Sequence, residues 1–217
     1  MNHRMIETIF AETLNQLHLS EPQKGVLRAS LTLFSAKGFE KTTAHDIARM
    51  AGVSENIVPD KASLLAAIVT PMIDHVVPES FDALLAEFQA KTAMSFTEVL
   101  TTVFQERLAF VDQNRLQLRV LYQEALNQSL IRAQLAEKRQ QLFQNSTINE
   151  LFTRYQVSGE LVNWAGYDIL RLILSVWLGA ILPRIMTDQP NLNQQQVVQQ
   201  VTTFLCHGLR PNCGDQH

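Results

Sequence analysis

Residues 24–54, KGVLRASLTLFSAKGFEKTTAHDIARMAGVS, carry two helix signals separated by turn residues. A stripe of apolar residues at helical spacing ends at Gly38, and glycine commonly follows the last residue of a helix. The quartet TAHD at 43–46 has the pattern of a capping box and predicts a short second helix. Gly52 supplies the positive φ of a turn, and Ser54 is expected to cap a third helix. Two short helices joined by such a turn predict a helix-turn-helix.

Helical periodicity continues through the rest of the chain and predicts an all-α fold. Apolar residues make up 46% and charged residues 18% of the 217 residues, which excludes a disordered chain. There are only 8 Gly and 7 Pro to interrupt the helices. Besides the helix that ends at Gly38, the expected helices cover 5–18, 44–50, 61–76, 79–91, 95–112, 114–126, 128–153, 160–186 and 193–208.

The segment 24–54 resembles the N-terminal domain of TetR-type transcriptional repressors. The matching positions are Leu27, Ala29, Leu33, Phe34, Gly38, Phe39, Thr42, Thr43, Ile47, Ala48, Ala51, Gly52, Val53 and Ser54. The resemblance implies a three-helix DNA-binding head with a helix-turn-helix, and a larger helical body for ligand binding and dimerisation. We therefore expect an N-terminal amphipathic extension over 1–19, the head over 20–63 and the body over 64–217.

The third helix of this pattern lacks four residues. In the family the serine is followed by x-Gly-Thr-aliphatic-Tyr-x-Tyr/His-Phe-x-x-Lys. Here residues 55–58 fill the first four places and residues 59–61 the last three, so a gap between Val58 and Pro59 restores the match on both sides. Either four residues are missing from this sequence, or the deletion is genuine and the third helix is a stub. A continuous chain requires Val58 to leave the helical region, because a following proline disfavours it.

A helix in the major groove contacts base edges from its N-terminal turn, which here contains Glu55 and Asn56. Asparagine can bond adenine through both amide atoms, and glutamate can accept from cytosine N4. Lysines and helix N-termini can contact phosphates. Each such residue, taken alone, is also typical of a solvated surface. With the resemblance, the candidate DNA contacts are Lys41, Thr42, Thr43, His45, Ser54, Glu55, Asn56 and Lys61.

The expected helix 160–186 is apolar almost all round its second half and must be buried on several sides. With the striped helix 193–208 it predicts a four-helix interface in a homodimer; burial within the monomer is the alternative. The resemblance also implies an effector pocket among the central helices. Its candidates, each of which could equally be plain core, are His75, Met94, Phe104, Phe110, Tyr122, Trp164 and Tyr167.

The chain has a formal net charge of −3, but residues 22–63 contain six basic and four acidic side chains, which suits nucleic acid weakly. Cys206 and Cys213 are expected to be reduced thiols. Together with His207 and His217 they match no standard zinc ligand spacing, so no metal site and no cofactor are predicted.

No signal peptide is evident, and the longest apolar run, 172–183, is expected to be too short to span a bilayer. The leading hypothesis is a bacterial, cytoplasmic, ligand-responsive repressor. Its expected partners are double-stranded operator DNA, a small-molecule effector and a second copy of the chain, without membrane contact. The alternative is a helical small-molecule or partner-binding protein that has lost operator binding through the shortened helix. No enzyme motif is present, so an enzyme is not expected.

Overall fold

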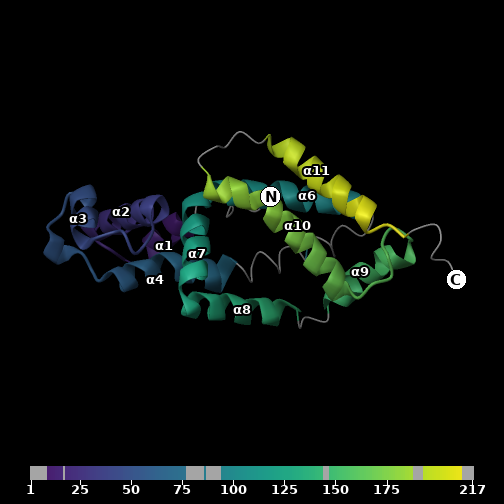
Figure 1. Cartoon of the computed structure of the whole chain (residues 1–217), viewed down its shortest axis with the longest axis horizontal. Helices are drawn as coiled ribbons and strands as arrows, with labels where there is room; N and C mark the ends of the chain where they lie inside the picture. The colour runs from purple at the N-terminus through teal and green to yellow at the C-terminus, as the bar shows by residue number, and fades with distance from the viewer. Residues whose placement is uncertain are drawn as a thin grey trace. The chain divides into compact units, whose positions relative to one another are not determined.

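The structure is a computed structural model that describes residues 9–16, 18–76, 86, 94–143, 147–187 and 193–211. Every regular element in these ranges is a helix (Figure 1). The chain divides into two compact units: Met1–Pro78 with Gln113–Lys138, and Glu79–Asp112 with Arg139–His217. The predicted all-α fold is therefore confirmed.

The first unit contains the predicted head. Its elements are α1 (Ile9–Gln16), α2 (Glu21–Lys37), α3 (Ala44–Ala51), the 3-10 turn η2 (Glu55–Ile57), α4 (Lys61–Pro71), the π turn η3 (Met72–Val76) and α7 (Arg115–Asn127). Helix α2 packs against α3, α4 and α7. The compact unit is thus larger than the expected 20–63 head, because α4 and α7 share its core. The expected helix 61–76 is α-helical as far as Pro71 and continues as the π turn η3. Pro71 has no N–H to donate and disturbs the preceding turn.

Local signals place the helix ends of the head as expected. Ser20 and Gln23 form a capping box at the start of α2, and Thr43 and Asp46 form one at the start of α3. Gly52 follows α3 in the left-handed region, with φ 68° and ψ 32°. These ends fix the lengths of α2 and α3 and therefore the place of the turn between them.

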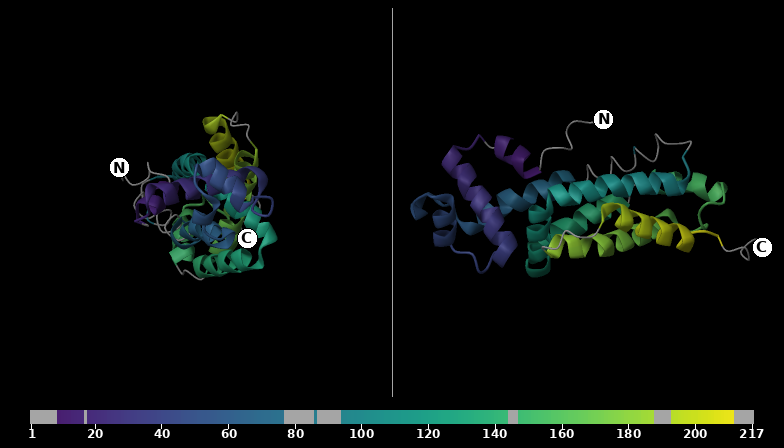
Figure 2. Two further views of the ribbon diagram at one scale, coloured as in Figure 1. Left: turned by 90° about the vertical axis from the view of Figure 1, so that its left-hand side faces the viewer. Right: turned by 90° about the horizontal axis from the view of Figure 1, so that it is seen from above.

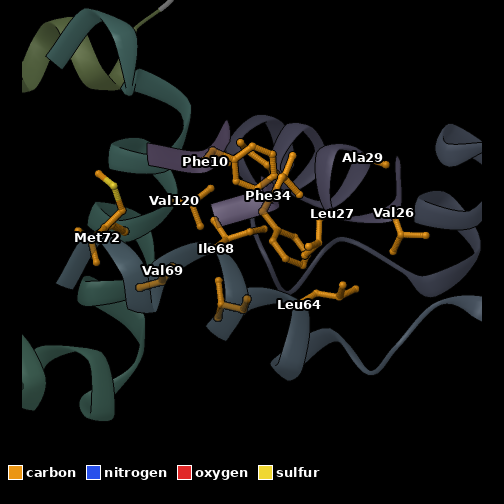
Figure 3. Packing of buried hydrophobic residues seen from close by; sticks show 14 of the residues in the cluster. Phe10, Val26, Leu27, Ala29, Phe34, Leu64, Ile68, Val69, Met72 and Val120 are labelled. Atoms are coloured by element: carbon orange, nitrogen blue, oxygen red, sulfur yellow. The ribbon is translucent and has the colours of Figure 1, made fainter. Parts of the chain in front are cut away.

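A hydrophobic cluster holds the first unit together (Figure 3). Phe34 and Ile47, from α2 and α3, are 0% exposed, and the Phe34 ring meets Phe39 edge to face at a centroid distance of 5.4 Å. Helix α4 contributes Leu64 and Ile68 to the same cluster. Within the head, α2, α3 and α4 are therefore held to one another by apolar contacts in this cluster.

The expected third helix is a single turn. The N–H of Ile57 donates to the Ser54 carbonyl at 3.0 Å, and the N–H of Val58 donates to the Glu55 carbonyl at 3.1 Å. Val58 then adopts φ −76° and ψ 118°, the extended backbone that a continuous chain requires before Pro59. The expected cap at Ser54 is wrong, because its side chain makes no capping hydrogen bond. Ser54 occupies the N-cap position, but its hydroxyl does not satisfy the first N–H groups of the turn, which have no partner within the turn.

The second unit contains α6 (Phe96–Gln113) up to Asp112, α9 (Thr147–Val157), α10 (Gly166–Met186) and α11 (Gln194–Gly208), whose ribbons can be followed by colour in Figure 2. Helix α8 (Ser129–Phe143) is divided between the two units after Lys138. Helix α10 packs against α9 and α11. The Phe104 ring of α6 stacks on Trp177 of α10 at a centroid distance of 4.5 Å. Arg184, only 7% exposed, donates to both carboxylate oxygens of Asp112. Apolar stacking and one ion pair thus join α6 to α10.

Two expected helices have different bounds. The helix expected over 160–186 begins at Gly166, because residues 158–165 form a loop. Gly159 in this loop has φ 77°, and the Gln156 amide donates to the carbonyls of Val162 and Trp164. Helices α8 and α9 replace the expected helix 128–153. The expected helix 79–91 lies outside the described residues except for residue 86.

Helix α10 also corrects an expectation about the membrane. Its 21 residues, with a mean hydropathy of 1.8 over 18 of them, are long and apolar enough to cross a bilayer by length and composition. The apolar run 172–183 alone is too short to cross a bilayer, but α10 extends beyond this run in both directions. The core helix of a protein outside membranes can have the same length and composition.

Candidate nucleic-acid interface

The outer face of α3 and the turn after it carry most of the predicted DNA contacts. Lys41, Thr43 and His45 are exposed, and so are Ser54, Glu55 and Asn56. The His45 Nδ1 lies 3.4 Å from a carboxylate oxygen of Glu55, which joins α3 to η2. Asn56 makes no hydrogen bond within the part of the chain that the structure describes. The amide of Asn56 is therefore available to a partner.

Asp46 fixes the N-terminus of α3. Its carboxylate accepts from the ammonium of Lys37 and from the hydroxyl and N–H of Thr43. A guanidinium nitrogen of Arg49 lies 3.3 Å from the other carboxylate oxygen. The hydrogen bond from Lys37, followed by those from Thr43, holds the pKa of Asp46 well below its ordinary value. The carboxylate stays ionised at neutral pH, where it also complements the positive end of the helix dipole.

Arg49 is a candidate contact that the sequence reasoning missed. Its side chain is 73% exposed and lies one turn after His45 on the same face of α3. The spacing of His45 and Arg49, four residues apart on a predicted helix, was the signal that could have found it. The guanidinium can reach phosphate as a bidentate donor.

Thr42 is a correction to the predicted DNA contacts. Its side chain is only 1% exposed, and its hydroxyl donates to the carbonyl of Gly38 at 2.8 Å. A buried hydroxyl that already has an acceptor cannot reach a phosphate. The Thr42 side chain therefore stabilises the loop between α2 and α3.

The Lys61 side chain points toward the loop between α2 and α3. Its ammonium donates to the carbonyls of Phe39 and Thr42 at 3.0 and 2.7 Å and lies 4.6 Å from the centroid of the Phe39 ring. Two of its three N–H donors are thus occupied by the chain itself. The phosphate contact expected of Lys61 competes with this internal role.

The residues predicted for an effector pocket are distributed over both units. Tyr122 lies on α7 in the first unit, whereas Met94, Phe104 and Phe110 belong to the second. Trp164 and Tyr167 are 49% and 46% exposed. The backbone of His75 lies in η3, but its side chain is outside the described part of the chain. The pocket residues remain predictions.

Comparison with known proteins identifies the helix-turn-helix segment. Residues 26–68, which run from α2 into α4, match the family model of bacterial regulatory proteins of the tetR family. Residues 26–68 are therefore a helix-turn-helix domain similar to those of tetR-family regulators. No curated protein sequence matches it.

Solved structures match most of the chain at low sequence identity. The ketosteroid transcriptional regulator KstR2 of Mycobacterium tuberculosis has a TM-score of 0.61 at 17% identity, covering 89% of this chain and 96% of its own. A tetR-family regulatory protein from Rhodococcus RHA1 has a TM-score of 0.60 at 17%, covering 89% and 100%. The regulator FadR from Bacillus subtilis, in complex with stearoyl-CoA, has a TM-score of 0.59 at 16%, covering 86% and 98%. At these identities the likeness concerns the fold alone.

Proposed function

We propose that the protein is a cytoplasmic, ligand-responsive repressor that binds operator DNA as a homodimer. The observation that carries this proposal is the outward-facing surface of α3 and η2, on which Asn56 is exposed with its amide unused by the described chain. The match of residues 26–68 to the tetR family supports it. Base edges would be read by Asn56 and Glu55, and phosphates would be contacted by Lys41, Thr43 and Arg49.

Repression of this kind requires no covalent chemistry. A dimer sets two heads at the spacing of the operator half-sites, and an effector with higher affinity for another arrangement shifts the population away from DNA. The structural relatives include a regulator in complex with stearoyl-CoA, which supports a small-molecule effector without identifying one here.

Exposed apolar side chains on α10 and α11 support the homodimer. Tyr167, Leu174 and Leu178 lie on one stripe of α10 and are 46%, 38% and 50% exposed. Phe204 of α11 is 65% exposed. Only 39% of the most apolar window of α10 is buried within the described chain. A second copy that covers this stripe would remove apolar area from water.

Gly179→Glu is expected to convert the dimer to monomers. Gly179 is exposed, and a Cβ at this position would meet no atom of the described chain within 4 Å. The monomer therefore accommodates the glutamate, whereas a dimer would bury its charge without a partner. Sedimentation velocity measures the result, with Ala133→Glu on the exposed face of α8 as the control. A Gly179→Glu protein that sediments as an intact dimer would place the interface elsewhere.

The alternative function is a helical small-molecule or partner-binding protein that has lost operator binding. The observation in its favour is the single 3-10 turn in place of a reading helix. Met50 and Ile57 beside it are 50% and 48% exposed, and such apolar side chains contribute little to phosphate binding. DNA binding by the chain as it stands decides between the two functions.

Asn56→Ala and Lys41→Ala are expected to affect DNA binding in different ways. Asn56→Ala should relax preference at one base position, because it removes a base-edge contact worth about 1–3 kcal/mol. Lys41→Ala should weaken binding to all sequences and reduce the salt slope by about one unit. Fluorescence anisotropy on operator libraries and random duplexes measures both. Equal losses for Asn56→Ala on all duplexes contradict its role, and salt-independent or absent binding by the unaltered chain favours the alternative function.

A further inference from the structure

Helices α6 and α11 of the second unit are tied together near both ends. Near one end the Thr97 hydroxyl donates to the Cys206 sulfur at 3.2 Å. Near the other, the Gln194 amide donates to the Asp112 carboxylate at 2.6 Å. The two helices thus run antiparallel. Between the two ties lies a groove of about 680 Å³, which is within the usual size of small-molecule sites.

The groove is lined almost wholly by neutral polar side chains. Nine of its ten lining residues are four threonines and five carboxamides, and the tenth is Val198. On α6 the lining positions Thr97, Thr101 and Gln105 recur every four residues, so one face of the helix is polar along the groove. A helix face directed at a neighbouring helix is usually apolar. This polar face is instead suited to a hydrogen-bonding occupant.

Thr202 of α11 supplies a second, independent observation. It lines the groove, it is 4% exposed, and its hydroxyl has no hydrogen-bond partner among the described residues. Two other helical threonines of the unit, Thr101 and Thr102, donate to carbonyls four residues earlier in their own helix at 2.8 and 3.0 Å. An unsatisfied buried hydroxyl destabilises a fold, so a partner from outside the chain is expected.

We propose that the α6–α11 groove binds a neutral polyhydroxylated small molecule, a sugar or polyol. Among the described residues no ionisable side chain lines the groove, so a carboxylate, phosphate or cation would lose its hydration without a countercharge from them. A purely apolar ligand would cover carboxamides without satisfying them. Hydroxyl groups both donate and accept, as do threonine and glutamine side chains, so a polyol can pair with Thr202 and with Gln105 or Gln199 together.

This site is separate from the effector candidates of the proposed function. None of the seven residues predicted for the effector pocket lines the groove. Ligand binding here is therefore measurable on the full chain whether or not the protein binds DNA, and failure of one proposal leaves the other standing.

The test titrates D-glucose, sucrose and myo-inositol into the full-length protein and follows saturation-transfer NMR and calorimetry. At least one of the three is expected to bind saturably in the millimolar range. Thr202→Val should weaken this binding by about tenfold, the effect of one buried hydrogen bond. Thr102→Val is the matched control and should leave binding unchanged, because Thr102 does not line the groove. The apo melting temperature of Thr202→Val should not fall, since the hydroxyl has no partner to lose.

Three results would overturn the proposal. The first is no saturable binding of any of the three probes across the millimolar range. The second is equal binding by Thr202→Val and the unaltered chain, with Gln105→Leu and Gln199→Leu equally without effect. The third is a loss of self-association in Thr202→Val without any change in probe binding, which would assign the groove to a second copy of the chain.

Discussion

Phe34→Ala is expected to destabilise the first unit by about 3–5 kcal/mol, the range for removing a buried phenylalanine. Phe34 is 0% exposed and lies in the cluster to which α2, α3 and α4 contribute. The change removes the edge-to-face contact with Phe39, whose ring in turn lies under the ammonium of Lys61. A cavity at this position therefore loosens the loop before α3 as well as the core.

Chemical denaturation followed by circular dichroism measures this loss. Leu126→Ala in the same unit is the control, because Leu126 is 63% exposed and its truncation should change the free energy of unfolding by less than about 0.5 kcal/mol. Since the head should loosen before the whole chain unfolds, DNA binding is expected to fall at temperatures where most helix remains. Equal stability of the Phe34→Ala and Leu126→Ala proteins would contradict the anchoring role.

Arg184→Met is expected to destabilise the second unit by about 3 kcal/mol, the lower end of the range for breaking a buried ion pair. Arg184 is 7% exposed and donates to both oxygens of Asp112, whereas the carboxylate is 28% exposed and also accepts from Gln194. Methionine keeps much of the apolar stem, so the loss reports mainly the charge that remains unpaired.

A double-mutant cycle separates this interaction from general damage. Asp112→Leu combined with Arg184→Met removes both charges and should restore a large part of the stability, because an uncompensated charge is no longer left partly buried. Additive losses in the double variant would show that the two side chains stabilise the unit independently. Urea unfolding of the full chain measures all four proteins.

Local signals in the sequence predicted the head well. The capping boxes at Ser20 and Thr43, and the glycines at 38 and 52, each act within four residues, so the sequence alone contains the information. The inward turn of Lys61 depends instead on its hydrogen bonds to the carbonyls of Phe39 and Thr42, which lie 22 and 19 positions earlier. Periodicity carries no signal for such contacts.

The second unit was predicted less well for the same reason. The Arg184–Asp112 pair joins residues 72 positions apart, and the loop before α10 is fixed by the Gln156 amide and the positive φ of Gly159. Apolar spacing alone predicts a helix that includes this loop. The groove between α6 and α11 was missed because its residues, read one helix at a time, are ordinary exposed threonines and glutamines.

The start of α4 is held in place independently of the turn that precedes it. Asp60 accepts from the Ser63 N–H, and Lys61 is bonded to the loop between α2 and α3. The segment from Ser54 to Pro59 can therefore lengthen or shorten while both of its ends stay fixed, at a cost in loop-closure entropy that grows only slowly with length. In evolutionary terms, a change in the length of this tip would require compensating changes mainly where the tip contacts the unit, at Val58 beside the hydrophobic cluster and at Glu55 beside His45.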